Sequence, residues 1–199
     1  MTADPLGFFL GELPAPPARL LEVGCGEGEL ARALDAAGYD VLAIDPVAPA
    51  GEIFRRTTIE ELDDSGPFDA VVSSRAIHHV HDLDAVLAKI GRLAPLLVLD
   101  EFAWDLFDEP TARWYDEQRA RSPDPPPPAA EWHSRHARLH GFDALRAALA
   151  RHFVERTFAP VPYLHRYMHV PELEPLEAEL IEAGEIRALA FRFVGTPRD

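Results

Sequence analysis

Residues 20–28 read LLEVGCGEG, and a second apolar run, VLAID, follows at residues 41–45. The first run ends in a turn that contains three glycines, and the second stops at the carboxylate of Asp45. A strand that turns tightly through glycines into a helix lets a ligand approach the backbone, where side chains would otherwise block it. An acid at the end of the next parallel strand can accept two hydrogen bonds from a ribose diol. The two stretches therefore predict a nucleoside-containing ligand at the carboxyl edge of a parallel sheet.

Apolar runs and amphipathic stretches alternate along the first half of the chain. Strands are expected at residues 20–23, 41–44, 54–58, 68–74 and 95–102. Helical segments are expected at residues 5–12, 28–37 and 59–62, and after the capping residue Asp82. This alternation indicates right-handed βαβ units and a parallel sheet that is covered on both faces.

The pattern changes after residue 102. Helices are expected at residues 110–121, 130–139, 142–151 and 172–183, with an extended proline-rich spacer at 122–128. Residues 153–161 and 186–194 alternate well enough for strands. We expect one α/β domain with a central sheet of seven strands. Within it, residues 1–102 would form the cofactor-binding half, 103–150 a helical insertion, and 151–199 the last strands and helix.

Composition narrows the function classes. The formal net charge of −15 disfavours binding to nucleic acid and to anionic membranes, which need clustered Lys and Arg. Cys25 is the only cysteine, so no internal disulfide or thiolate metal cluster is expected, and a small side chain in a crowded turn is the favoured interpretation. The sequence shows no secretory leader and no apolar stretch of membrane-spanning length, so a cytoplasmic protein is expected.

The glycine turn favours one class of nucleoside ligand over another. Its spacing is Gly-x-Gly-x-Gly, whereas a pyrophosphate is typically seated by Gly-x-Gly-x-x-Gly. Glu22 stands two residues before the first glycine, where a carboxylate would repel a pyrophosphate and attract a cation. Here the chain resembles the class I methyltransferases that use S-adenosylmethionine. The resemblance extends through Asp45, through GPFDAVVSSRAIHHV at 66–80 and through LAPLLVLDEF at 93–102.

This resemblance implies a Rossmann-like sheet of seven strands, mainly parallel with an antiparallel last strand, and helices on both faces. It also implies roles for individual residues. The Gly24–Gly26 backbone and Glu22 would line the methionyl and ribose part of S-adenosylmethionine, and Asp45 would bind the ribose hydroxyls. Thr58 and Ile59 stand where the family often has an acid that reads adenine. The expected cofactor-binding residues are Glu22, Gly24, Cys25, Gly26, Gly28, Asp45, Pro46, Thr58, Ile59, Ser73 and Ser74.

Catalytic candidates follow the fourth and fifth strands. His78 or His79 could accept a proton from a substrate hydroxyl or amine, since imidazole titrates near neutral pH. A histidine that only hydrogen-bonds the backbone of a helix turn is the alternative. Asp100 and Glu101 end the fifth strand and could orient a substrate or a histidine, or cap a helix.

Two further clusters lie in the second half. His133, His136 and His140 share a helix face, but two arginines intervene and no metal ligand completes a shell, so no metal site is expected. An aromatic and basic cluster follows the strand at 153–161, and it could close a substrate pocket or pack the insertion onto the sheet. Its members are Tyr163, His165, Arg166, Tyr167 and His169.

The sequence thus predicts a methyltransferase that moves a methyl group from S-adenosylmethionine to an unidentified small molecule by in-line displacement. Oxygen, nitrogen and carbon acceptors are all open, as is the oligomeric state. One alternative is a non-catalytic protein that binds S-adenosylmethionine. Another is a nicotinamide-dependent oxidoreductase, which would need the longer glycine spacing. Residues 103–150 and the N-terminal segment would form a lid over the acceptor.

Overall fold

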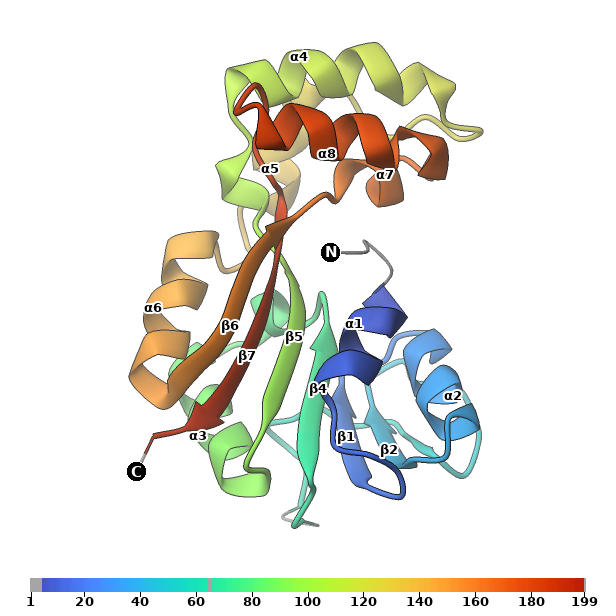
Figure 1. Cartoon of the computed structure of the whole chain (residues 1–199), viewed down its shortest axis with the longest axis vertical. Coiled ribbons are helices and arrows are strands. Elements are labelled where there is room, and N and C mark those ends of the chain that lie inside the picture. Colours follow the sequence, from blue (N-terminus) through green and yellow to red (C-terminus); the bar gives the residue numbers. More distant parts are fainter. Residues whose placement is uncertain (1–4, 64–65, 199) are drawn as a thin grey trace.

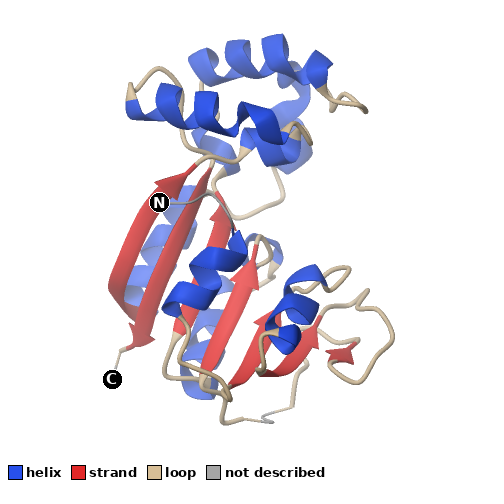
Figure 2. Cartoon of the chain, turned by 45° about the vertical axis from the view of Figure 1, so that its right-hand side comes forward, coloured by secondary structure: helices blue, strands red, loops and turns tan. Residues whose placement is uncertain are grey.

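The computed structural model of the chain describes residues 5–63 and 66–198. A seven-stranded sheet in the order β3-β2-β1-β4-β5-β7-β6 forms its centre (Figures 1 and 2). The strands are β1 (Arg19–Val23), β2 (Asp40–Ile44), β3 (Phe54–Arg55), β4 (Ala70–Ser74), β5 (Leu97–Phe102), β6 (Phe153–Val161) and β7 (Ala190–Pro197). β7 is antiparallel to both of its neighbours, and the pairings from β3 to β5 are parallel. The predicted Rossmann-like α/β fold with an antiparallel last strand is confirmed.

Helices cover both faces of the sheet. Helices α1 (Pro5–Glu12) and α2 (Glu29–Ala36) bury one apolar cluster, and α3 (Leu83–Leu93) and α6 (Phe142–His152) bury another. Successive side chains of a strand point to opposite faces, so Leu20 joins the first cluster and Leu21 the second. Because β1, β4 and β5 are apolar on both faces, they form the buried centre of the sheet, as their sequences predict.

Three elements are shorter than the sequence predicts. The third strand covers only Phe54–Arg55: it begins at the expected residue but ends early, because its pairing partner β2 ends at Ile44. Residues 59–62 form a hydrogen-bonded turn, in which Leu62 N donates to Thr58 O at 3.0 Å, and no helix. The expected helix at 130–139 is reduced to α5 (Trp132–His136), preceded by the 3-10 turn η4 (Ala129–Glu131).

A helical group stands beyond the carboxyl ends of the parallel strands (Figure 1). It combines α4 (Glu109–Gln118) and α5 with α7 (Leu164–Tyr167) and α8 (Glu174–Glu182), which lie in the connection from β6 to β7. A third apolar cluster fills it, and in that cluster Phe107 stacks on Trp132 with ring centroids 4.2 Å apart. Helix α6 belongs to the same stretch of sequence as α4 and α5 but packs on the sheet beside α3. The remaining short helices are η1 (Ile77–His79), η2 (Trp104–Leu106), η3 (Arg119–Arg121) and η5 (Pro171–Leu173).

A helix that spans a bilayer needs about 20 consecutive apolar residues. In residues 5–63 and 66–198, no helix is both long enough and apolar enough to cross a membrane.

Candidate active site

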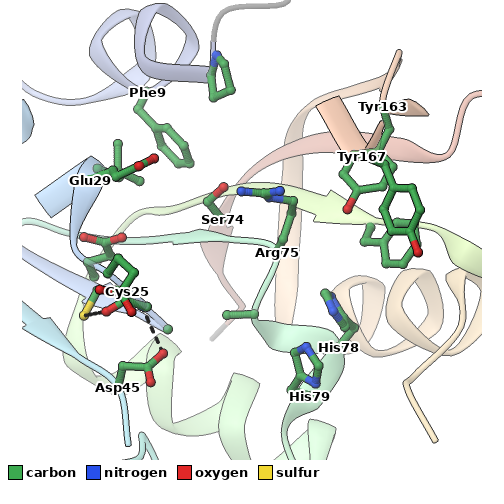
Figure 3. Close-up of a pocket in the computed structure, with 18 of the residues that line it drawn as sticks. Phe9, Cys25, Glu29, Asp45, Ser74, Arg75, His78, His79, Tyr163 and Tyr167 are labelled. Atoms are coloured by element: carbon green, nitrogen blue, oxygen red, sulfur yellow. Dashed lines mark hydrogen bonds between the residues drawn. The ribbon is translucent and has the colours of Figure 1, made fainter. Parts of the chain in front are cut away.

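A cavity of about 940 Å³ opens at the carboxyl edge of the sheet, between the sheet and the helical group (Figure 3). One side is formed by α1, by the turn after β1, by α2 and by the end of β2. The opposite side is formed by the β4–η1 segment, by the end of β5 and by α5 and α7. Of the expected cofactor-binding and catalytic residues, the cavity is lined by Glu22, Gly24, Cys25, Gly26, Asp45, Ser74, His78 and His79.

The first two glycines of the turn have different surroundings: Gly24 is tightly packed, and Gly26 faces open space. Gly24 has a φ of +78°, and a Cβ on it would lie 2.0 Å from the Cβ of Ala76. Only glycine lets β1 and the β4–η1 segment approach this closely. Gly26 also has a positive φ, of +48°, but a Cβ there would meet nothing within 4 Å. The turn therefore presents bare backbone to the cavity, which suits a ligand that lies against the main chain.

Asp45 ties this turn to the end of β2. Its Oδ2 accepts a hydrogen bond from Gly26 N at 3.1 Å, and its Oδ1 accepts one from Val47 N at 2.9 Å. Each carboxylate oxygen can accept a further bond. The two backbone hydrogen bonds hold the carboxylate in place. Because it lines the cavity, its remaining lone pairs can accept hydrogen bonds from two hydroxyl groups of a ligand.

Glu22 is the most unusual carboxylate of the cavity. Its side chain is 2% exposed, and its buried Oε2 accepts no hydrogen bond from the described residues. Burial, followed by the nearby charge of Asp45, raises the pKa of Glu22 from 4.5 to about 7. An unpaired carboxylate oxygen in a low-dielectric wall is costly unless a cation binds it. The residues present thus fit a ligand that carries a positive charge at this end of the cavity.

Cys25 lies beside these two acids. Burial, with the charges of Glu22 and Asp45, raises the pKa of its thiol to about 12. The side chain therefore stays protonated near neutral pH and is a poor nucleophile.

Several expected cofactor-binding residues do not line the cavity. Gly28 directly precedes α2 and donates its N–H to Cys25 O at 2.8 Å. Pro46, which follows Asp45, is exposed. Thr58 Oγ1 accepts from Glu61 N at 3.2 Å, and Ile59 is buried in the core. Ser73 is also buried, and its hydroxyl donates to Val23 O at 2.8 Å, whereas Ser74 reaches the cavity.

His78 and Glu101 form a buried pair at the cavity wall. His78 Nδ1 is hydrogen-bonded to Glu101 Oε1. Glu101 also accepts from Ile77 N at 2.9 Å and from Phe102 N at 2.6 Å, so its carboxylate is fixed by the backbone. A carboxylate bound to Nδ1 favours the tautomer with a proton there, which leaves the Nε2 lone pair of His78 as a proton acceptor.

The neighbouring His79 and Asp100 have different surroundings. His79 is exposed, and its pKa is lowered by partial burial and by His78, whose ring centroid lies 4.3 Å away. Asp100 is fully buried and faces away from Glu101, toward Arg166, whose guanidinium donates to both carboxylate oxygens at 3.1 and 3.2 Å. Asp100 therefore anchors α7 to the sheet and does not line the cavity.

Aromatic side chains from the second half complete the wall opposite the glycine turn (Figure 3). Phe102 packs on Tyr163 with centroids 4.6 Å apart, and Tyr167 and His136 lie beside them. Glu177, buried in α8, holds this wall in place. It accepts from Tyr163 N at 2.7 Å, from two further backbone N–H groups, and from the Nδ1 of His165.

Nothing in the sequence patterns predicted the role of Glu177, and Tyr163 and Tyr167 appeared only as members of a cluster with two possible roles. The three spaced histidines separate in the structure. His136 lines the cavity, His133 packs edge-on against Trp104, and His140 bonds Val80 O at 2.9 Å through Nε2.

Known proteins resemble this chain in sequence and in fold. The model of a methyltransferase domain family matches residues 3–159. The ubiquinone biosynthesis O-methyltransferase of Rhodopseudomonas palustris (strain BisB5) is 36% identical over 92 residues, which cover 40% of this chain and 35% of that protein. The chain therefore spans about a third of the length of the curated relatives it matches.

Two solved structures share the fold. An S-adenosylmethionine dependent methyltransferase from Mesorhizobium loti superposes with a TM-score of 0.59 at 18% identity, over 95% of both chains. The 1,6-didemethyltoxoflavin-N1-methyltransferase of Burkholderia thailandensis was solved with 1,6-didemethyltoxoflavin and S-adenosylhomocysteine. It superposes with a TM-score of 0.57 at 21% identity, over 98% of this chain and 75% of that one. The family model covers more than half of the sequence, and the chain belongs to this family of methyltransferase domains.

Proposed function

We propose that this protein transfers a methyl group from S-adenosylmethionine to a hydroxyl oxygen of a small aromatic acceptor. The observation that carries the proposal is the buried His78–Glu101 pair, which stands at the cavity wall next to the aromatic side chains. The Rhodopseudomonas relative is an O-methyltransferase of ubiquinone biosynthesis, which supports oxygen as the acceptor atom.

The cofactor side of the cavity suits a cationic nucleoside. S-adenosylmethionine supplies a methyl group on a sulfonium, which leaves as a neutral thioether. In our proposal the unpaired Oε2 of Glu22 binds the positively charged amino group, and Asp45 accepts hydrogen bonds from the ribose diol. The backbone from Gly24 to Gly26 lies against the methionyl part. Pro46, Thr58, Ile59 and Ser73 do not line the cavity and would support the cofactor site only indirectly.

His78 would take the acceptor's proton. As the hydroxyl oxygen forms its bond to the methyl carbon and the carbon–sulfur bond breaks, the proton moves from that oxygen to Nε2 of His78. Glu101 stabilises the imidazolium that results, because its carboxylate is already bound to Nδ1. The proton passes to solvent after the methylated product leaves.

Positioning contributes more than proton transfer to this reaction. Holding two reactants in attack geometry can lower the barrier by about 7–11 kcal/mol. A general base adds about 10²–10⁴-fold, or roughly 3–5 kcal/mol. The aromatic wall of Phe102, Tyr163 and Tyr167 would supply the positioning by stacking a flat ring against the cofactor side.

The test compares phenols with matched anilines as acceptors, with formation of S-adenosylhomocysteine as the readout. We expect transfer to phenols, and a fall in kcat of about 10²–10³-fold in His78→Gln. His81→Ala is the control, because His81 is exposed and does not line the cavity. Transfer to anilines alone, or an unchanged kcat in His78→Gln, would contradict the proposal. Tight binding of S-adenosylhomocysteine without transfer to any acceptor would favour the non-catalytic alternative.

A further inference from the structure

The acidic and the basic side chains of the cavity come from opposite sides of it. All of its carboxylates, from Glu22, Glu27, Glu29 and Asp45, belong to the stretch 22–45 on the glycine-turn side. Its guanidinium and imidazole groups, from Arg75, His78, His79, Arg135 and His136, belong to 75–136 on the opposite side. Figure 3 shows Glu29 and Asp45 on one side of the cavity and His78 and His79 on the other, with Arg75 between them beside Ser74. The side on which the acceptor would bind therefore carries two guanidinium groups, from Arg75 and Arg135, and no lining carboxylate, in a chain whose net charge is −15.

Arg75 is held at this side by its backbone. It has a φ of +56°, in the left-handed region that residues other than glycine and asparagine rarely adopt. Its N–H donates to Asp100 O at 2.8 Å, which fixes the residue at the end of β4. Its guanidinium lies beside the hydroxyl of Tyr163 and counteracts the rise in the pKa of Tyr163 that burial causes. Among the described residues it forms no ion pair, so its charge is open to a ligand.

Arg135 supplies the second cation from α5, next to His136. Its one ion pair in the described part of the chain joins its Nη1 to Glu131 Oε2 at 3.9 Å, with both side chains about half exposed. Exposed pairs of this length contribute little. The guanidinium can therefore turn to an anion in the cavity at small cost.

We propose that the acceptor is an aromatic hydroxy acid, whose carboxylate is bound by Arg75 and Arg135 while its ring lies against Phe102 and Tyr163. This inference rests on the proposed function and adds the charge of the substrate to it. A guanidinium offers paired N–H donors that match a carboxylate. An anionic group on this side also directs the acceptor away from Glu22 and Asp45, so that its hydroxyl approaches His78 in a single orientation.

The experiment first measures binding of S-adenosylhomocysteine by calorimetry, and then titrates that complex with 2-, 3- and 4-hydroxybenzoate and with their neutral methyl esters. Fluorescence of Trp104 and Trp132, which contact His136, reports binding. We expect at least one acid to bind tenfold or more tightly than its ester. Arg75→Gln and Arg135→Gln should each reduce that preference to about twofold, with the affinity for S-adenosylhomocysteine unchanged.

Arg113→Gln is the matched control, because Arg113 lies on α4 in an exposed pair with Glu109 and does not line the cavity. Binding of no acid at millimolar concentration, or equal binding of acids and esters, would overturn the inference and leave methyl transfer intact. Loss of S-adenosylhomocysteine affinity in Arg75→Gln would also overturn it, because Arg75 would then belong to the cofactor. Failure of the unmodified protein to bind S-adenosylhomocysteine would instead count against the proposed function.

Discussion

Replacing Glu22 by glutamine tests the cofactor side of the cavity most directly. The pKa of Glu22 is about 7 in the folded protein, against 4.5 for a glutamate that is exposed to water, as in the unfolded chain. Because the folded pKa is raised, the stability contributed by protonated Glu22 is fully present below pH 4.5 and is lost as the pH rises through 7. Each pKa unit corresponds to about 1.36 kcal/mol, so the ionised carboxylate costs about 3 kcal/mol above pH 8. Glutamine has the same size and no charge.

We therefore expect Glu22→Gln to stabilise the ligand-free protein at pH 8 by up to about 3 kcal/mol. In a chain of this length that raises Tm by roughly 6–12 °C. At or below pH 4.5 the two proteins should unfold at similar temperatures, since Glu22 is then protonated. Thermal unfolding followed by circular dichroism at both pH values measures the difference.

The same substitution should weaken the cofactor site. At pH 6 about one tenth of ligand-free molecules carry an ionised Glu22, so S-adenosylhomocysteine should bind the unmodified protein about tenfold more weakly at pH 6 than at pH 8. Calorimetry in two buffers of different ionisation enthalpy should detect release of a proton on binding. In Glu22→Gln the affinity should be low at both pH values. A variant that is no more stable at pH 8 and that binds with the affinity of the parent would refute this reasoning.

Three further tests, with four substitutions, address other parts of the structure. Gly24→Ala should destabilise the protein by about 2–4 kcal/mol in urea titrations, because its Cβ would lie 2.0 Å from that of Ala76. Glu177→Gln should cost about 2–3 kcal/mol in the same assay and raise the KM for the acceptor, since one of its oxygens accepts bonds from the N–H and ring of His165. Asp45→Ala should weaken binding of S-adenosylhomocysteine by about 10²-fold or more, as measured by calorimetry, whereas His79→Ala should lower kcat less than tenfold.

Each of these three tests has a clear contrary result. A Gly24→Ala protein that unfolds like the parent would show that the turn can move away from the β4–η1 segment. An unchanged KM in Glu177→Gln would show that Glu177 of α8 does not affect binding of the acceptor. Unchanged affinity in Asp45→Ala, with the fold intact by circular dichroism, would remove Asp45 from the cofactor site.

The first half of the fold could be predicted because its signals are local. Strands buried on both faces appear as continuous apolar runs, and Asp82 caps α3 as expected, accepting from Ala85 N at 3.0 Å. The boundary of the last strand was less accurate. Residues 186–194 alternate as a strand does, but β7 covers Ala190–Pro197, because Ile186 and Leu189 are buried in the helical group instead.

Spacing along a strand explains which site residues could be predicted. The sequence predicts both Asp100 and Glu101 as catalytic candidates. Adjacent residues of a strand point to opposite faces of the sheet, so only one of the two can face His78. Glu101 shares its face with Leu97 and Leu99, which pack toward α3 and η1, so only Glu101 can reach His78. The same period separates Ser73, bonded to β1, from Ser74 at the cavity.

The acceptor side depends on contacts between distant parts of the sequence. Glu177 meets the start of α7 across η5, and Arg166 meets Asp100 across 66 residues. The partners in such pairs are too far apart in the sequence for a helix or strand period to relate them. The predicted cluster at 163–169 therefore divided in the structure, with Tyr163 and Tyr167 at the cavity and His165 and Arg166 hydrogen-bonded to the buried carboxylates of Glu177 and Asp100.

The connection from β6 to β7 leaves and re-enters the sheet at one place, since Val161 at its start pairs with Ala190 at its end. Any segment whose two ends meet at this spacing could be grafted there without altering the strands that carry Glu22 and Asp45. Exchange of this one connection would replace Tyr163 and Tyr167 of the cavity wall and leave the glycine turn, Glu22 and Asp45 in place.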